Sequence, residues 1–450
     1  MLFIAWYYQD ITPLINNTSV VASECQVTVP TPTPNDDETN NCTVKIGIIN
    51  TFTTNGACHA GGTEHKRGYE LALNELNSMG GINGCQIELV QIDDQGDSIA
   101  AGTAVITLAE PGATVAESIP LIIGAYSSRS TLAAAEEADA QEIPLIIPSA
   151  SSSLITMLGF EWIFRINADS DDYVRQAMAL TNTIDDSPTI GILHENTLFG
   201  ESAAVAVISQ AEEEGIGVAA YETYQPNDAT TNLYPSINTL KSANPDVVYL
   251  ISNSIDDSIN ILETSKALNF TPKLFIANAG AFVSPDFLEK ASVAAENVVV
   301  TAQWAEDVSW HYEDEGSTDV EEFIGQFRAT YDGDTPGMRS VQTYTSLRLA
   351  KDVIEQAQNK ESCNTSIKQL RTCIQAELRQ LDLEHTLFGA INFDDTTGQN
   401  NHPVLLVQIV CSGEHDANGN CISNQFQFVT VFPEEYRSQE IILPTQEANE

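Results

Sequence analysis

Short apolar, β-branched runs alternate with helical patterns through most of the chain, and this alternation limits the fold more than any other feature. Each run is continuously apolar, which is typical of strands that are covered on both faces. Strand–helix alternation favours right-handed crossovers and parallel sheets. The runs are Val44–Ile49, Ile87–Ile92, Pro120–Ile123, Pro144–Ile147, Thr189–Leu193, Val247–Ile251, Leu274–Ala277 and Val298–Thr301. With so many strands in 450 residues, we expect two α/β sheets side by side.

Helical patterns follow these runs. In Lys66–Met79, for example, Tyr69, Leu73 and Leu76 share one face, as expected for a helix that packs on a sheet. The other helical stretches are Thr131–Gln141, Glu201–Glu214, Asp257–Leu268, Val320–Tyr331 and Val341–Gln358. The segments before and after this alternating region have no such pattern. Residues 26–43 are rich in Pro, Thr and Asp, a composition that stays extended, and the tail from about Pro433 is similar.

The charge balance excludes some partners. The chain has 63 Asp and Glu against 19 Lys and Arg. So little basic charge makes nucleic acid a poor partner, and an anionic membrane surface should repel the chain. No apolar run approaches the roughly 20 residues that span a bilayer, so we expect no direct membrane insertion. The scattered acids are interpreted as solvated helix faces, and an acidic binding surface is the alternative.

The eight cysteines form four pairs that are local in the sequence, and none has the C-x-x-C spacing of a zinc or redox site. Disulfides in an oxidising compartment fit this pattern, with free buried thiols as the alternative. The chain should therefore be periplasmic or extracellular, with a membrane tether and a signal upstream of Met1 left open. The expected pairs are Cys25 with Cys42, Cys58 with Cys85, Cys363 with Cys373, and Cys411 with Cys421.

Two serine-rich loops follow neighbouring strands. Gly124-Ala125-Tyr126-Ser127-Ser128-Arg129-Ser130-Thr131 follows one run, and Pro148-Ser149-Ala150-Ser151-Ser152-Ser153 follows the next. In an open parallel sheet, ligands bind beyond the carboxyl ends of the strands. Hydroxyls and free amides at a helix N-terminus form a neutral cradle for a carboxylate or amide oxygen. Ordinary helix capping explains one such loop, whereas two at successive strand ends favour a site.

Motifs of common enzymes are missing. The first strand–helix turn has no G-x-G-x-x-G, and no Walker A, H-E-x-x-H or G-x-S-x-G sequence occurs. We therefore predict no catalytic residues, no cofactor and no metal site, although a carboxylate dyad among the 63 acids has no local signature.

Several segments together resemble the type I periplasmic binding proteins, in particular the leucine/isoleucine/valine-binding group of ABC importers. The resemblance covers about residues 44 to 410. It rests on Lys45–Ile49, Gly68–Asn77, Gly80–Gly84, Asp93-Asp94, Ile123-Gly124 with Ser127-Ser128, Pro144–Ser151, Phe164-Arg165, Phe199-Gly200-Glu201, Leu387-Phe388-Gly389, Phe393-Asp394 and Gly398.

The resemblance implies two lobes, each a parallel sheet flanked by helices, joined by crossing hinge segments and closing on the ligand. One lobe would comprise residues 44–168 and 303–390, and the other residues 169–302 and 391–432. Residues 1–43 would form an N-terminal segment with a linker, and residues 433–450 a tail.

The resemblance also implies the site. The family's carboxylate-binding positions fall on Ser128, Ser149 and Ser151, with Ala150 between the last two. On the opposite lobe, an aromatic position falls on Phe199, a tyrosine position on or near Asn253, and the acid that holds a ligand ammonium on or near Asn278 or Ala279. A buried ammonium without a partner is strongly disfavoured, so a branched-chain amino acid is in doubt. Amides suit an amide, urea-like or hydroxylated ligand, with Glu195 or Asp171 as alternative sources of charge.

The leading hypothesis is a solute-binding protein that captures a small polar ligand (an amino acid, amide or related carboxylate) for the membrane subunits of an ABC importer. A ligand-sensing ectodomain with the same fold is the second hypothesis. An extracellular hydrolase is the third.

Overall fold

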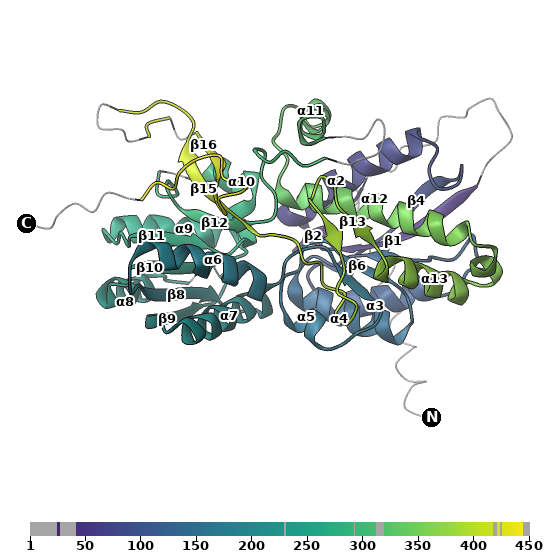
Figure 1. Ribbon diagram of the computed structural model, residues 1–450, viewed down its shortest axis with the longest axis horizontal. Coiled ribbons are helices and arrows are strands. Elements are labelled where there is room, and N and C mark those ends of the chain that lie inside the picture. Colours follow the sequence, from purple (N-terminus) through teal and green to yellow (C-terminus); the bar gives the residue numbers. More distant parts are fainter. Residues whose placement is uncertain are drawn as a thin grey trace, which may run out of the picture.

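The computed structural model describes residues 25–27, 42–228, 231–291, 293–311, 319–416, 421–423 and 425–443. Most of the predicted linker and the last seven residues of the tail lie outside these ranges. Two sheets lie side by side, and helices cover each of them (Figure 1). The predicted fold class, two α/β lobes with parallel strands, is therefore confirmed.

The first sheet has five parallel strands in the order β4-β1-β5-β6-β7. Its strands are β1 (Thr43–Asn50), β4 (Gln86–Asp93), β5 (Ile122–Ile123), β6 (Leu145–Ile147) and β7 (Ile163–Arg165). Neighbouring residues face opposite layers: Ile48 packs in the same core as α2 and α12, whereas Ile49 packs in the core of α3 and α4. Burial on both faces is the reason why these strands appear as continuous apolar runs.

The helices of this lobe form two layers. They are α2 (Ala60–Ser78), α3 (Ser98–Ala109), α4 (Ser128–Ala140), α5 (Leu154–Met157), α12 (Met338–Gln358) and α13 (Ile367–Arg379). Helices α2 and α12 pack so closely that a Cβ added at Gly68 would lie 2.1 Å from the backbone oxygen of Ser340. Residues far apart in the sequence are thus brought to one lobe.

The second sheet has seven strands in the order β16-β15-β12-β11-β10-β8-β9. They are β8 (Thr189–Glu195), β9 (Gly217–Tyr224), β10 (Val247–Ile251), β11 (Leu274–Ala277), β12 (Val299–Ala302), β15 (Leu405–Cys411) and β16 (Phe426–Phe432). The first five of these are parallel, and β15 and β16 extend the sheet antiparallel. The sequence prediction did not include three of these strands (β9, β15 and β16), nor β7 of the first sheet.

The helices around the second sheet are α6 (Ser170–Ile184), α7 (Leu198–Glu214), α8 (Tyr234–Ala243), α9 (Ile255–Ala267), η1 (Gly280–Val283) and α10 (Pro285–Lys290). The remaining elements are β2 (Thr53–Thr54), β3 (Ala57–Cys58), α11 (Val320–Thr330), η2 (Glu361–Thr365), β13 (Asp382–Leu383) and β14 (Ile391–Asn392). Within the described ranges, no helix combines the length and apolar character that a membrane crossing needs.

The chain passes between the two sheets three times, after β7, after β12 and after β14. The first of these segments contacts the other two, since Arg165 pairs with Gln399 and the Ala168 N–H donates to the Gln303 side chain. We keep the lobe boundaries predicted from the sequence as a proposal.

All eight cysteines form disulfides, but two predicted pairings are wrong. Cys363–Cys373 and Cys411–Cys421 are confirmed. Cys25 pairs with Cys58 rather than Cys42, and Cys42 pairs with Cys85 rather than Cys58. The sheet explains the exchange, because the β1–β4 pairing begins at Thr43 and Gln86 and so places Cys42 beside Cys85. For these four cysteines, strand pairing determines the disulfides and proximity in the sequence does not.

Candidate ligand-binding site

Two connected hollows lie between the lobes, at the carboxyl ends of the strands. The inner cavity has a volume of about 40 Å³ and is lined by residues of both lobes and of the connecting segments. The outer cleft, about 610 Å³, shares several of these residues, including Tyr126, Ser128, Phe199 and Arg339. The inner cavity alone has room for a few water molecules, so a ligand with more than a few atoms must extend into the cleft or separate the lobes.

The first-lobe wall of the inner cavity includes Ser127, Ser128, Ser149 and Ser151. Ser127 is the N-cap of α4 and accepts a hydrogen bond from the Ser130 N–H, so capping accounts for that serine. Ser128 has another role: its hydroxyl oxygen accepts from the Ser152 N–H at 3.3 Å and thereby joins the two serine loops. The predicted Ser128, Ser149 and Ser151 thus come together at one wall.

Ala150 does not line either hollow. It is buried, and its backbone carbonyl accepts a hydrogen bond from Arg165 at 3.3 Å. We therefore assign its part in the site to the backbone.

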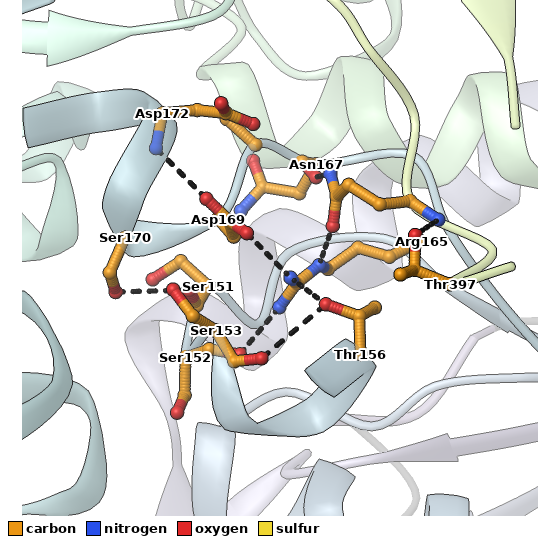
Figure 2. A network of polar contacts seen from close by, with 12 residues as sticks. Ser151, Ser152, Ser153, Thr156, Arg165, Asn167, Asp169, Ser170, Asp172 and Thr397 are labelled. Atoms are coloured by element: carbon orange, nitrogen blue, oxygen red, sulfur yellow. Dashed lines mark hydrogen bonds and ion pairs between the residues drawn. The ribbon is translucent and has the colours of Figure 1, made fainter. Parts of the chain in front are cut away.

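Arg165, at the end of β7, holds the second serine loop in place (Figure 2). Its fully buried guanidinium donates to the backbone oxygen of Ser152 at 2.7 Å and to the Thr156 hydroxyl at 2.8 Å. It also donates to the Gln399 side chain at 2.6 Å, and a carboxylate oxygen of Asp169 lies 3.6 Å away. Burial lowers the pKa of Arg165 to about 10, which still leaves the group charged at neutral pH.

A chain of amides connects this loop to the interior of the cavity. The Asn167 amide donates to the backbone oxygen of Ser149 at 2.8 Å. Its oxygen accepts from the Tyr173 hydroxyl at 2.8 Å and from the Gln342 amide at 2.7 Å. Asn167, Tyr173 and Gln342 all line the inner cavity, and none of them was predicted.

The facing wall comes from the second lobe and is less polar. Phe199, Asn253, Ala279, Gly280 and Val283 line it. The predicted Phe199, Asn253 and Ala279 thus line the inner cavity, and Ala279 is one of the two residues on or near which the resemblance placed the ammonium partner.

Asn278 does not line either hollow. Its side chain is 2 % exposed, and its oxygen accepts from the Thr301 hydroxyl at 3.2 Å. The backbone turns at Ala279, where φ is 38°, so the side chain of Ala279 reaches the cavity and that of Asn278 does not.

Arg339 is the main feature that the sequence analysis missed. It lies in the first turn of α12, is 6 % exposed, and lines both the inner cavity and the outer cleft. Its guanidinium donates across the cleft to the Gly280 carbonyl and, at 3.3 Å, to the Asn253 side chain. A cation at a helix N-terminus opposes the helix dipole, and this local conflict was the one available signal.

Glu64 is the counterion of Arg339. One of its oxygens lies 3.3 Å from Arg339 and accepts from the Ser284 hydroxyl of the second lobe at 2.6 Å. Burial raises the pKa of Glu64, and the charge of Arg339 acts in the opposite direction. Arg339 and Glu64 therefore both bind the opposite lobe, and the lobes touch across the cleft in this conformation.

Neither alternative acid reaches the inner cavity. Glu195 lines the outer cleft, where its carboxylate accepts from the Asn253 N–H at 2.6 Å and from the Thr197 hydroxyl at 2.7 Å. Burial raises its pKa. Asp171 is exposed in the first turn of α6 and lines neither hollow.

Comparison with known proteins agrees with the two-lobed fold. The family model described as periplasmic binding protein matches residues 43–417. A Leu/Ile/Val-binding protein homolog of Brucella abortus is 24% identical over 323 residues, which cover 69% of this chain and 76% of that protein.

Two solved structures share the fold. A leucine binding protein of Thermotoga maritima has a TM-score of 0.69 and 20% identity, covering 87% of this chain and 99% of that one. A solute binding protein of an ABC transporter from Rhodopseudomonas palustris, in complex with 3,4-dihydroxy benzoic acid, has a TM-score of 0.67 and 17% identity. That match covers 86% of this chain and 96% of that one.

Proposed function

The chain belongs to the periplasmic binding protein family, and from this premise we propose that it captures a small polar ligand between its lobes and delivers it to the membrane subunits of an ABC importer. The proposal makes the protein a binder that returns its ligand chemically unchanged, outside the cytoplasm.

The serine wall is the observation that carries the proposal. Ser128, Ser149 and Ser151 converge on one cavity, although they come from two loops; Arg165 and Asn167 hold the second loop, and Ser128 accepts from the Ser152 N–H. Hydroxyl groups and the first amides of α4 are donors for a carboxylate or amide oxygen. Donors that are fixed before binding lose little freedom when a ligand arrives, which favours affinity.

The contacts across the cleft support a hinged mechanism. Arg339 reaches the Gly280 carbonyl, and Ser284 reaches Glu64, so that closure forms bonds between the lobes. A ligand bound between them adds to the same set of contacts. It therefore shifts the population towards the closed state by its differential affinity for that state.

The relatives support transport, and they differ in what they bind. One neighbour is described as a leucine binding protein, and another was solved with 3,4-dihydroxy benzoic acid. The four disulfides support a location outside the cytoplasm. We propose that the ligand is an amino acid, an amide or a related carboxylate.

A thermal-shift screen of amino acids, amides and small carboxylates tests the proposal. A true ligand at a hundredfold excess over its Kd should stabilise the folded protein by about 2.7 kcal/mol. Ser128→Ala and Ser151→Ala should each reduce that shift, whereas Ser187→Ala, in the exposed turn before β8, should leave it unchanged. The proposal fails if no compound raises the melting temperature, or if the serine variants respond like the wild type.

A further inference from the structure

Two polar atoms at the inner cavity have no hydrogen-bond partner within the described part of the chain. They are the Ser149 hydroxyl oxygen and the Gln342 side-chain oxygen, and both are buried from solvent. A buried polar group without a partner costs about 1–3 kcal/mol, so each of these atoms favours a ligand group that would bond to it.

The orientation of the Gln342 amide follows from its neighbours. The Ser149 backbone carbonyl can only accept, so the Asn167 group bonded to it is the NH₂. The Asn167 oxygen therefore faces Gln342, and the group that Gln342 directs to it must be its own NH₂. What remains for the cavity is the Gln342 oxygen, which is an acceptor. Gln342 itself is fully buried.

The cavity thus offers donors on one side of Asn167 and an acceptor on the other. Ser149 and Gln342 are both bonded to the single carboxamide of Asn167, so one small molecule can reach both. The serines suit a carboxylate. The Gln342 oxygen needs a hydrogen-bond donor on the same ligand, close to that carboxylate.

The charges decide what kind of donor this is. Among the residues that the structure describes, no Asp or Glu lines the inner cavity, and its one charged side chain is Arg339. Three carboxylates line the outer cleft instead: Glu64, one oxygen of which is bonded to Ser284 and Arg339, Glu195, which is bonded to the Asn253 N–H, and the exposed Asp256. A ligand ammonium here would lose its hydration beside a cation, whereas a neutral hydroxyl meets no such penalty.

We infer that the ligand is a small 2-hydroxy carboxylate, which has a hydroxyl group where an amino acid has its ammonium. Its carboxylate binds Ser128, Ser149 and Ser151, and its hydroxyl donates to the Gln342 oxygen. Phe199 and Val283 then cover its carbon skeleton. This inference rests on the proposed function and specifies its ligand class.

A matched series of ligands provides the test. Calorimetric titration of the purified full chain, after exhaustive dialysis, compares three acids on one skeleton: 2-hydroxy-4-methylpentanoate, leucine and 4-methylpentanoate. Lactate, alanine and propanoate form a shorter series for the small cavity. In the series that fits, the hydroxy acid should bind at least about tenfold more tightly than both its amino and its unsubstituted counterparts.

Gln342→Leu should remove the advantage of the hydroxy acid over the unsubstituted acid, while the unsubstituted acid keeps its affinity. Gln356→Leu makes the same change at an exposed position of α12 and should preserve the wild-type ranking. Gln342 also bonds to Asn167, so this variant can be less stable than the wild type. If it does not fold, the order of affinities of the wild-type chain for the three acids tests the proposal by itself.

The outcomes separate the ligand class from the function. Leucine or alanine binding as tightly as its hydroxy counterpart overturns the 2-hydroxy carboxylate and leaves the proposed function standing. The same holds if only amides or other panel compounds bind. Absence of binding across the whole panel contradicts the proposed function itself.

Discussion

Replacing Arg165 with methionine should destabilise the protein and weaken ligand binding together. Arg165 is fully buried, and its guanidinium bonds to the carbonyls of Ala150 and Ser152 and to the side chains of Thr156 and Gln399. Methionine fills much of the same volume but donates nothing, so the Gln399 oxygen is left buried without its bond and the Ser152 carbonyl keeps only the bond from the Ile155 N–H.

The size of the effect follows from those lost bonds. A buried acceptor left unsatisfied costs about 1–3 kcal/mol, and the removal of one member of a buried charged network costs about 3–5 kcal/mol. We therefore expect Arg165→Met to lower the free energy of unfolding by about 4 kcal/mol. Because the serine loop loses its anchor, ligand affinity should fall by at least about tenfold, the equivalent of 1.4 kcal/mol.

Urea unfolding and calorimetric titration measure the two effects. The matched control is Arg175→Met on α6, because Arg175 pairs with Asp172 at 2.6 Å but its side chain is 64% exposed. An exposed ion pair contributes at most about 1 kcal/mol, so the control should stay close to the wild type. The reasoning is refuted if Arg165→Met unfolds within 1 kcal/mol of the wild type, or if both variants lose the same amount.

Three further predictions concern packing, pH and the disulfides. Gly68→Ala should destabilise the protein by about 1–3 kcal/mol, because the new Cβ would contact the α12 backbone. Gly325→Ala, where α11 has open space around the added Cβ, should instead stabilise it by about 0.5–1 kcal/mol. Chemical unfolding of the two variants measures both changes in the free energy of unfolding. Burial lowers the pKa of His402 from 6.5 to about 4, so the unfolded chain binds more protons between these values and stability should fall as the pH drops from 6.5 towards 4. The His402 contribution, about 3 kcal/mol at most, should be missing from the pH profile of His402→Gln. Removing Cys363 and Cys373 together should cost about 3 kcal/mol, and equal melting temperatures for this variant and the wild type would contradict it.

The sequence was sufficient for most of the fold because buried parallel strands carry a strong signal. Runs such as Val247–Ile251 are apolar on both faces, and the structure buries every residue of β10. The edge strand β9 was missed because most of it is exposed, so it lacks the continuous apolar run that marks a buried strand. The antiparallel pair β15 and β16 follows the last crossing between lobes, where the strand–helix alternation ends.

The candidate site was predictable only where local sequence creates it. The two serine loops each contain their own donors, and the structure places Ser128, Ser149 and Ser151 at one cavity. Arg339 and Gln342 belong to a helix almost 200 residues later, and their positions depend on the packing of α12 against α2. Apart from the unfavourable cation at the α12 N-terminus, no local sequence pattern indicates such a contact. The exchanged disulfides have the same cause, since strand pairing rather than spacing determines them.

The most direct test of a ligand-capturing cleft is native mass spectrometry of the purified chain, before and after denaturation. We expect the folded chain to carry one small carboxylic acid, either copurified or added from the panel, and to release it unchanged on unfolding. The Arg175→Met control should retain it, and the Ser128→Ala, Ser151→Ala double variant should not. A folded chain that keeps its own mass in the presence of every panel compound, or that converts a compound into another, would contradict the account.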